Sequence, residues 1–79
     1  MMQINYIKDT INTLEQAVQP ETLLDDDDYQ KIALRILKCE SFIEDKKISA
    51  KIDVKWFSEL TDFFYDKMMK EIGDDEEKE

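Results

Sequence analysis

Carboxylates are the side chains of this 79-residue chain most able to do chemistry, because they are numerous and grouped. Asp25, Asp26, Asp27 and Asp28 form an unbroken run, and a second acidic run closes the chain at 74–79. Twenty Asp and Glu residues against eleven Lys and Arg residues give a net charge of −9. Nucleic acids and anionic membrane surfaces repel such a chain, so we expect neither as a direct partner. Its electrostatic partners should be basic proteins or cations.

The aspartate run does not have the pattern of a calcium-binding loop. Such a loop places oxygen ligands at alternate positions, has a central Gly and closes with a bidentate Glu. Here Asp25 and Asp27 are followed at the alternate positions by Tyr29 and Lys31, and no Gly is nearby. We therefore expect no specific metal site and no cofactor. One or two of the aspartates instead fit the start of a helix, where they can cap free N–H groups.

Most enzymatic chemistries lack their residues in this sequence. The absence of His excludes His-based catalytic triads and His-containing zinc motifs. A single Cys, Cys39, cannot form an internal disulfide or a Cys-x-x-Cys pair, and a single Gly, Gly73, excludes a phosphate-binding loop. We therefore expect a protein that is not an enzyme. The lone Cys and an N-terminus without a signal-peptide pattern favour a cytoplasmic protein, and no apolar run is long enough to span a membrane.

The spacing of apolar residues predicts three helices. Residues 4–18 place Ile, Leu and Val at alternating spacings of three and four, which is typical of an amphipathic helix, and Pro20 ends this segment. Residues 28–45 and 54–72 show the same periodicity. For the last helix, Asp53 is the predicted N-cap and Gly73 the predicted stop.

The helix predicted at 28–45 carries apolar residues on two sides. One stripe includes Ile32 and Ile36, and the other includes Leu34 and Leu37. The two stripes are centred roughly 160° apart at about 100° per residue. A helix that is apolar on two sides is usually buried between two neighbours. We therefore expect an all-α fold, a small three-helix bundle in which this second helix is central.

Residues 46–53 show a different pattern from the predicted helices. Ile48, Ala50 and Ile52 alternate with polar residues, which favours an extended conformation. Because the chain offers few partners for a single strand, we interpret 46–53 as an extended connection packed on the bundle, with a short helical turn as the alternative. Residues 1–73 should form one helical domain. Residues 74–79 should be a disordered acidic tail, since they have no apolar side chain to bury.

The helix predicted at 54–72 combines a row of carboxylates with an excess of apolar residues. Glu59, Asp62 and Asp66 fall along one face, at spacings that place neighbouring Cβ atoms about 5–6 Å apart. Such a row can imitate the charged backbone of a nucleic acid. Tyr65 and Met69 widen the apolar arc to roughly 200°, although one neighbouring helix needs only about 100°. The excess is consistent with a partner or a homodimer.

These features together predict a non-enzymatic inhibitor or modulator that presents carboxylates to a basic, nucleic-acid-binding surface of a target protein. The residues predicted to contact that target are Asp25, Asp26, Asp27, Asp28, Trp56, Glu59, Asp62, Tyr65, Asp66 and Met69. In size and charge, though in no sequence motif, the chain resembles small acidic phage-type proteins that block host DNA-binding or defence proteins as DNA mimics. Two alternatives remain. One is a structural or adaptor module that forms a homodimer through the apolar face of the last helix, and the other is an antitoxin or immunity protein.

Overall fold

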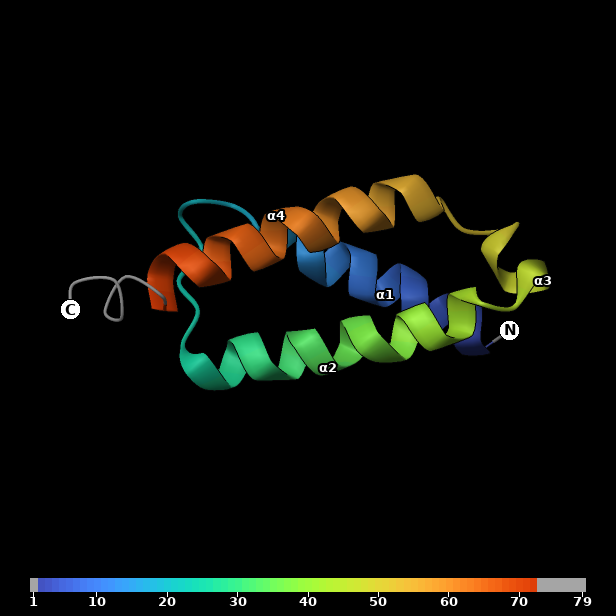
Figure 1. Cartoon of the computed structure of the whole chain (residues 1–79), viewed down its shortest axis with the longest axis horizontal. Helices are drawn as coiled ribbons and strands as arrows, with labels where there is room; N and C mark the ends of the chain where they lie inside the picture. Colours follow the sequence, from blue (N-terminus) through green and yellow to red (C-terminus); the bar gives the residue numbers. More distant parts are fainter. Residues whose placement is uncertain (1, 73–79) are drawn as a thin grey trace.

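The computed structural model describes residues 2–72, which form four helices and no strand. Helix α1 spans Met2–Ala17, α2 spans Asp26–Ile43, α3 spans Lys46–Ser49 and α4 spans Val54–Ile72. The three long helices run along the long axis of the molecule, and α3 lies at the end where α2 turns towards α4 (Figure 1). The prediction of an all-α helical bundle is confirmed.

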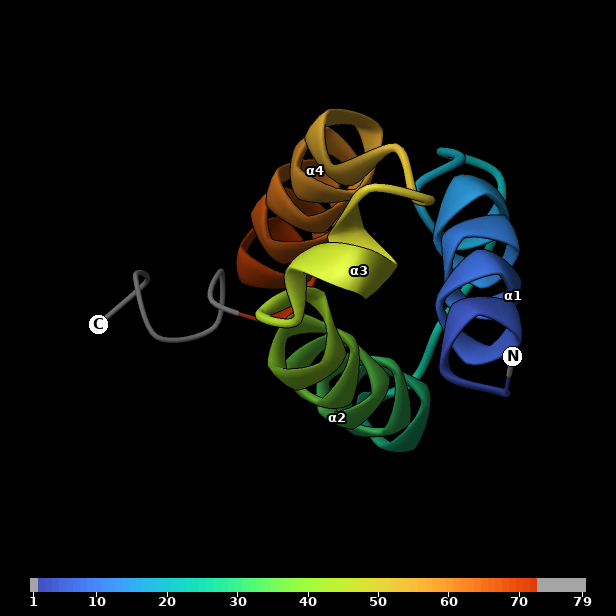
Figure 2. The ribbon, with the colours of Figure 1, turned by 90° about the vertical axis from the view of Figure 1, so that its right-hand side faces the viewer.

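The core fills the space between the three long helices. In an end-on view these helices form a triangle, with α3 across one opening (Figure 2). Spacings of three and four turn one stripe of each helix inwards. The buried apolar residues are Ile4, Ile7, Leu14, Ala17, Tyr29, Ile32, Ile36, Cys39, Ile48, Phe57, Leu60 and Phe64. The rings of Tyr29 and Phe64 pack with their centres 5.6 Å apart and thereby join α2 to α4.

Helix α2 buries only one of its two apolar stripes. Ile32 and Ile36 lie in the core, whereas Leu34 and Leu37 are 66% and 56% exposed. The expectation that α2 is central therefore requires correction, because each long helix occupies one corner of the triangle (Figure 2). The second apolar stripe of α2 did not require a second neighbouring helix, because apolar side chains need not be buried. More than half of the surface of a typical folded protein is apolar.

The connection at 46–53 is not extended throughout. It contains a short helical turn, which was the alternative to the predicted extended connection. Asp45 is the N-cap of α3, since its side chain accepts a hydrogen bond from Lys47 N at 2.9 Å. Ile48 is buried, and Ile52 packs against the core four residues later. Residues spaced by four satisfy helical periodicity as well as alternation, so the sequence pattern was ambiguous. Within residues 2–72 no strand offers a partner for an extended segment.

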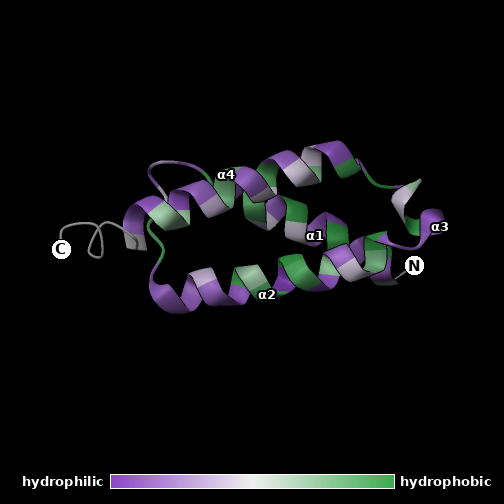
Figure 3. Ribbon diagram, in the orientation of Figure 1, coloured by the Kyte–Doolittle hydropathy of each residue, from purple (hydrophilic) through white to green (hydrophobic). Residues whose placement is uncertain are grey.

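The helix starts follow the predicted capping residues. Asp53 accepts a hydrogen bond from Trp56 N at 3.0 Å, as expected of the N-cap of α4. Asp25 caps α2. The hydrophilic start of α2 contrasts with the hydrophobic residues along its middle (Figure 3). The predicted stop at Gly73 and the predicted acidic tail at 74–79 lie outside the described residues.

Candidate protein-binding surface

The aspartates of the run 25–28 lie at the start of α2, where three of them have partners in the chain. Asp28 N donates to the Asp25 carboxylate at 2.9 Å, and Asp25 N donates to the Asp28 carboxylate at 3.4 Å. This reciprocal arrangement is a capping box. Asp27 lies 3.1 Å from the Lys31 ammonium. Only Asp26 lacks such a partner within the part of the chain that the structure describes, so the run is mainly the start of a helix.

The carboxylate row of α4 is exposed and less neutralised. Glu59, Asp62 and Asp66 all face solvent. Asp66 pairs with Lys70 at 3.3 Å, whereas Glu59 and Asp62 form no ion pair with any other residue in the range 2–72. An exposed pair such as Asp66–Lys70 contributes only about 0.3–0.5 kcal/mol, so a cation on a partner can replace Lys70. The unneutralised carboxylates of the predicted site therefore lie mainly on α4.

Two aromatic residues of α4 are exposed beside this row, on the side that faces α1. Trp56 is 37% exposed and Phe63 is 55% exposed. They are seven residues apart, which places them on the same side of the helix, two turns from each other. The Trp56 indole N–H donates to the Glu15 carboxylate of α1 at 2.9 Å, and this bond fixes the ring against α1. Trp56 is one of the predicted contact residues, whereas Phe63 is not.

The seam between α1 and α4 is hollowed on both sides of Phe63. A hollow of about 430 Å³ is lined by Val18, Pro20, Phe63, Asp66, Lys67, Lys70 and Glu71. A second hollow of about 400 Å³ is lined by Glu15, Val18, Gln19, Trp56, Leu60 and Phe63. Phe63 and Val18 border both hollows, so the two form one surface. We call this surface the α1–α4 groove.

Lys67 forms one border of the groove and joins α4 to the end of α1. Its ammonium donates to the backbone carbonyl oxygens of Ala17, Gln19 and Thr22, each at 2.7 Å. The last carbonyls of a helix have no partner within the helix, and a cation there also complements the helix dipole. This contact, the Lys67 clamp, was not predicted. Its acceptors are backbone atoms 45 to 50 residues away, which no residue type reveals.

Tyr65 and Met69 lie on the other flank of α4, towards α2. The Tyr65 ring packs against Phe64 with 5.6 Å between centres. Burial, and to a smaller extent the Glu40 carboxylate of α2, raises the pKa of the Tyr65 hydroxyl. Met69 lies one helical turn further on and is 66% exposed. The predicted contact residues thus lie in three places. These are the start of α2, the outer row of α4 with the flank that faces α1, and the flank of α4 that faces α2.

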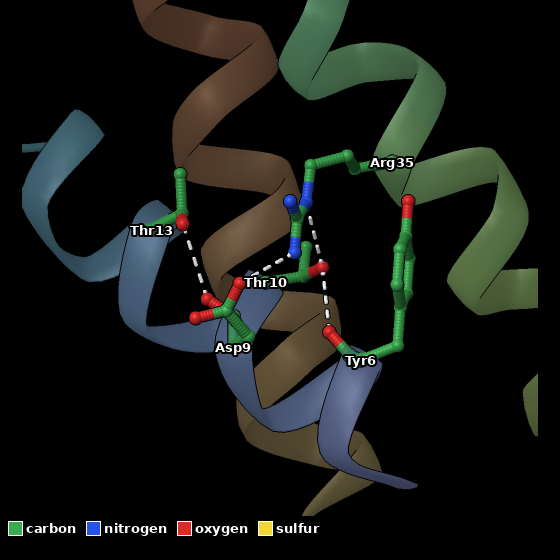
Figure 4. Close-up of polar contacts among 5 residues, drawn as sticks. All are labelled: Tyr6, Asp9, Thr10, Thr13 and Arg35. Atoms are coloured by element: carbon green, nitrogen blue, oxygen red, sulfur yellow. Dashed lines mark hydrogen bonds and ion pairs between the residues drawn. The ribbon is translucent and has the colours of Figure 1, made fainter. Parts of the chain in front are cut away.

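A polar network fills the middle of the seam between α1 and α2 (Figure 4). Nearer the start of α1, the same seam has a hollow of about 470 Å³ lined by Met2, Gln3, Tyr6, Lys38 and Phe42. Thr10 is fully buried; its hydroxyl donates to Tyr6 O at 2.9 Å and accepts from Arg35 Nε at 3.1 Å. The Arg35 guanidinium also pairs with Asp9 at 2.8 Å and lies 4.6 Å from the centre of the Tyr6 ring. The nearby Cys39 thiol is buried, and this burial raises its pKa. Arg35 is therefore a structural residue here.

Among residues 2–72, no three acidic or Cys side chains are arranged to hold a metal ion. None of the helices in this range has the length and apolar composition needed to cross a membrane. Comparisons with protein-family models, with curated proteins and with solved structures gave no match. Function is therefore inferred from the surface of the chain itself.

Proposed function

We propose that this protein is a non-enzymatic inhibitor or modulator that binds a basic, nucleic-acid-binding surface of a target protein. The observation that carries the proposal is the exposed row of Glu59, Asp62 and Asp66 on α4, in which two carboxylates have no ion pair within residues 2–72. A helix holds such groups at fixed intervals of about 5–6 Å between Cβ atoms. The row can thus occupy Lys and Arg residues that otherwise contact phosphates, in the manner of a DNA mimic.

The charge of the chain should act mainly on the rate and salt dependence of binding. Complementary charges steer two proteins together, and salt screens this attraction. The screening length falls from about 10 Å at 0.1 M salt to about 3 Å at 1 M. We expect capture of the target to weaken strongly over this range. A cytoplasmic location belongs to the same proposal, since the single Cys39 is a free, buried thiol.

The test is capture of proteins from a cell extract on the immobilised chain at low and high salt. A captured protein supports the proposal if it binds DNA or RNA and if the free chain competes with that nucleic acid in a gel-shift assay. We expect the double variant Glu59→Gln/Asp62→Asn to reduce capture at low salt at least tenfold. The variant Glu21→Gln/Glu44→Gln is a matched control, because it removes the same charge from two exposed positions outside the row, in the loop after α1 and at the C-cap of α2.

The control separates a specific row from a general effect of net charge. Equal losses in the two double variants would show that only the total charge matters. Capture that survives both variants and high salt would show that the electrostatic mechanism is wrong. The variant Asp26→Asn/Asp27→Asn removes two charges at the start of α2 but keeps the capping residues Asp25 and Asp28. It measures whether the aspartate run takes part in binding.

A further inference from the structure

We infer that the α1–α4 groove receives the apolar face of a basic amphipathic helix from the target. This inference rests on the proposed function, because the same target would supply both the basic and the apolar residues. Its apolar side chains would enter the hollows on the two sides of Phe63. Its Lys or Arg side chains would lie against Glu59 and Asp66, which neighbour Phe63 on the surface of α4.

The exposure of Phe63 differs sharply from that of the next residue of the same type. Phe64 is fully buried, so the core already has its aromatic layer, whereas Phe63 projects between two hollows. Trp56 adds a second aromatic ring two turns earlier, about 10 Å along the helix. Helices that bind in grooves use apolar anchors one and two turns apart. The groove therefore has the dimensions for two anchors of one partner helix.

The charges around the groove favour a basic occupant. Glu59 precedes Phe63 by four residues and Asp66 follows it by three, so both are neighbours of Phe63 on the surface of α4. Glu15 and Glu71 also line the hollows. Of the two lysines there, Lys67 bonds to three carbonyl oxygens and Lys70 pairs with Asp66. An apolar anchor flanked by Lys or Arg one turn away on each side matches this arrangement.

A second copy of this chain matches the groove less well. In an antiparallel two-fold contact across Phe63, the same flank of each α4 faces its copy. The rows that contain Glu59, Asp62 and Asp66 would then lie on one side of the contact and repel each other. Each chain also has a net charge of −9. A basic helix meets neither obstacle.

The single Trp of the chain lies in the groove and can report binding directly. The probe is a Trp-free synthetic peptide of about 18 residues, made of Leu, Ala and Lys, with Leu on one helical face and Lys beside it. A scrambled peptide of the same composition and charge is the control. We expect a saturable blue shift of Trp56 fluorescence with the amphipathic peptide, and binding at least tenfold weaker with the scrambled one.

Matched variants assign the binding to the groove. We expect Phe63→Ala to weaken binding of the amphipathic peptide at least tenfold without changing the helical circular dichroism of the protein. Leu34→Ala removes a similarly exposed apolar side chain from α2, outside the groove and the predicted contact residues, and should leave the affinity unchanged. Equal binding of the two peptides, or equal effects of the two variants, would overturn the inference. So would a dimer in sedimentation experiments that Phe63→Ala dissociates, because a second copy would then occupy the groove.

The two proposals can fail separately. If the Glu59→Gln/Asp62→Asn variant loses the target but Phe63→Ala does not, the proposed function stands and the groove inference is wrong. If Phe63→Ala abolishes binding of both peptide and target while Glu59→Gln/Asp62→Asn still binds both, the groove binds its partner through apolar contacts. The electrostatic mechanism of the proposed function is then wrong.

Discussion

Helix α1 meets its two large neighbours in different ways. Against α2 the middle of the seam is filled, because Arg35 bonds to Thr10 and Asp9 and covers the Tyr6 ring. Against α4 the Lys67 clamp secures the end of α1, while the seam beside it is hollow. The polar network fixes how α1 and α2 pack, and the hollow of this seam lies beyond the network, near the start of α1. The hollow seam shows that the fold is held together without covering all its aromatic surface, and that surface is available to a partner.

The largest expected change in stability distinguishes the buried Phe64 of α4 from the exposed Phe63. Phe64→Ala should reduce the free energy of unfolding by about 3–5 kcal/mol, since it leaves a cavity in the core. Phe63→Ala should change it by less than about 0.5 kcal/mol, because Phe63 is mostly exposed. Urea unfolding followed by circular dichroism measures both values. If the Phe64→Ala protein is already unfolded without urea, Phe64→Leu is measured in its place. Similar losses of unfolding free energy at positions 63 and 64 would show that the seam is not hollow.

The second prediction concerns the Lys67 clamp. Lys67→Met keeps the aliphatic stem but removes three hydrogen bonds to backbone carbonyls, so we expect a loss of about 2 kcal/mol. Lys70→Met, one turn later on the same helix, removes only an exposed pair with Asp66 and should cost less than about 0.5 kcal/mol. Both are measured by urea unfolding. Equal costs would mean that the clamp contributes no more than an ordinary surface lysine.

The third prediction tests the filled seam against a matched hydroxyl outside it. Thr10→Val removes the acceptor of Arg35 Nε and a buried donor to Tyr6 O, and should cost about 1 kcal/mol. Thr13 makes the same kind of bond, to Asp9 O, but in an exposed position. Thr13→Val should therefore change the stability by less than about 0.5 kcal/mol. A Thr10 variant as stable as the Thr13 variant would indicate that the network adds little to the packing.

The fourth prediction, equal in size to the third near neutral pH, concerns the seam between α2 and α4. Tyr29 is buried and its hydroxyl donates to the Glu71 carboxylate. Burial first, and then the bond to Glu71 and its charge, raises the pKa of Tyr29 above its ordinary value. The folded state thus holds this proton more tightly than the unfolded chain does. The stability contributed by the protonated Tyr29 hydroxyl is therefore complete below pH about 10 and is lost as the pH rises further.

Unfolding measurements across an alkaline pH series test the role of Tyr29. Tyr29→Phe should cost about 1 kcal/mol at neutral pH, where it removes one hydrogen bond. It should also make the alkaline loss of stability less steep. Tyr65→Phe is the comparison, since Tyr65 is only partly buried and should contribute less to that slope. An unchanged slope in the Tyr29 variant would contradict the tight retention of its proton.

The long helices and their starts could be predicted because local interactions specify them. The apolar spacing in α1 and α4 placed both helices, and Asp53 was identified as a cap from its position before an apolar run. The segment 46–53 was harder, because Ile48 and Ile52 fit both a strand and a helical turn. The capping bond of Asp45 and the burial of Ile48 favour the turn.

The candidate surface was only partly predictable, because it depends on which sides of α4 its neighbours cover. The carboxylates Glu59, Asp62 and Asp66 could be selected from spacing alone. The exposure of Phe63 could not, since Phe63 and Phe64 are the same residue type at adjacent positions. The Lys67 clamp depends on where α1 ends relative to α4, which is a property of the assembled fold.

The Lys67 clamp also has a consequence for the lifetime of the folded state. Its hydrogen bonds join residues 45, 48 and 50 positions apart, whereas the helices form from contacts between near neighbours. We expect contacts of this span to close only after α4 has docked, so that their loss accelerates unfolding and leaves the folding rate nearly unchanged. Lys67 should then govern how long α1 and α4 stay together once folded, and with them the groove that they enclose.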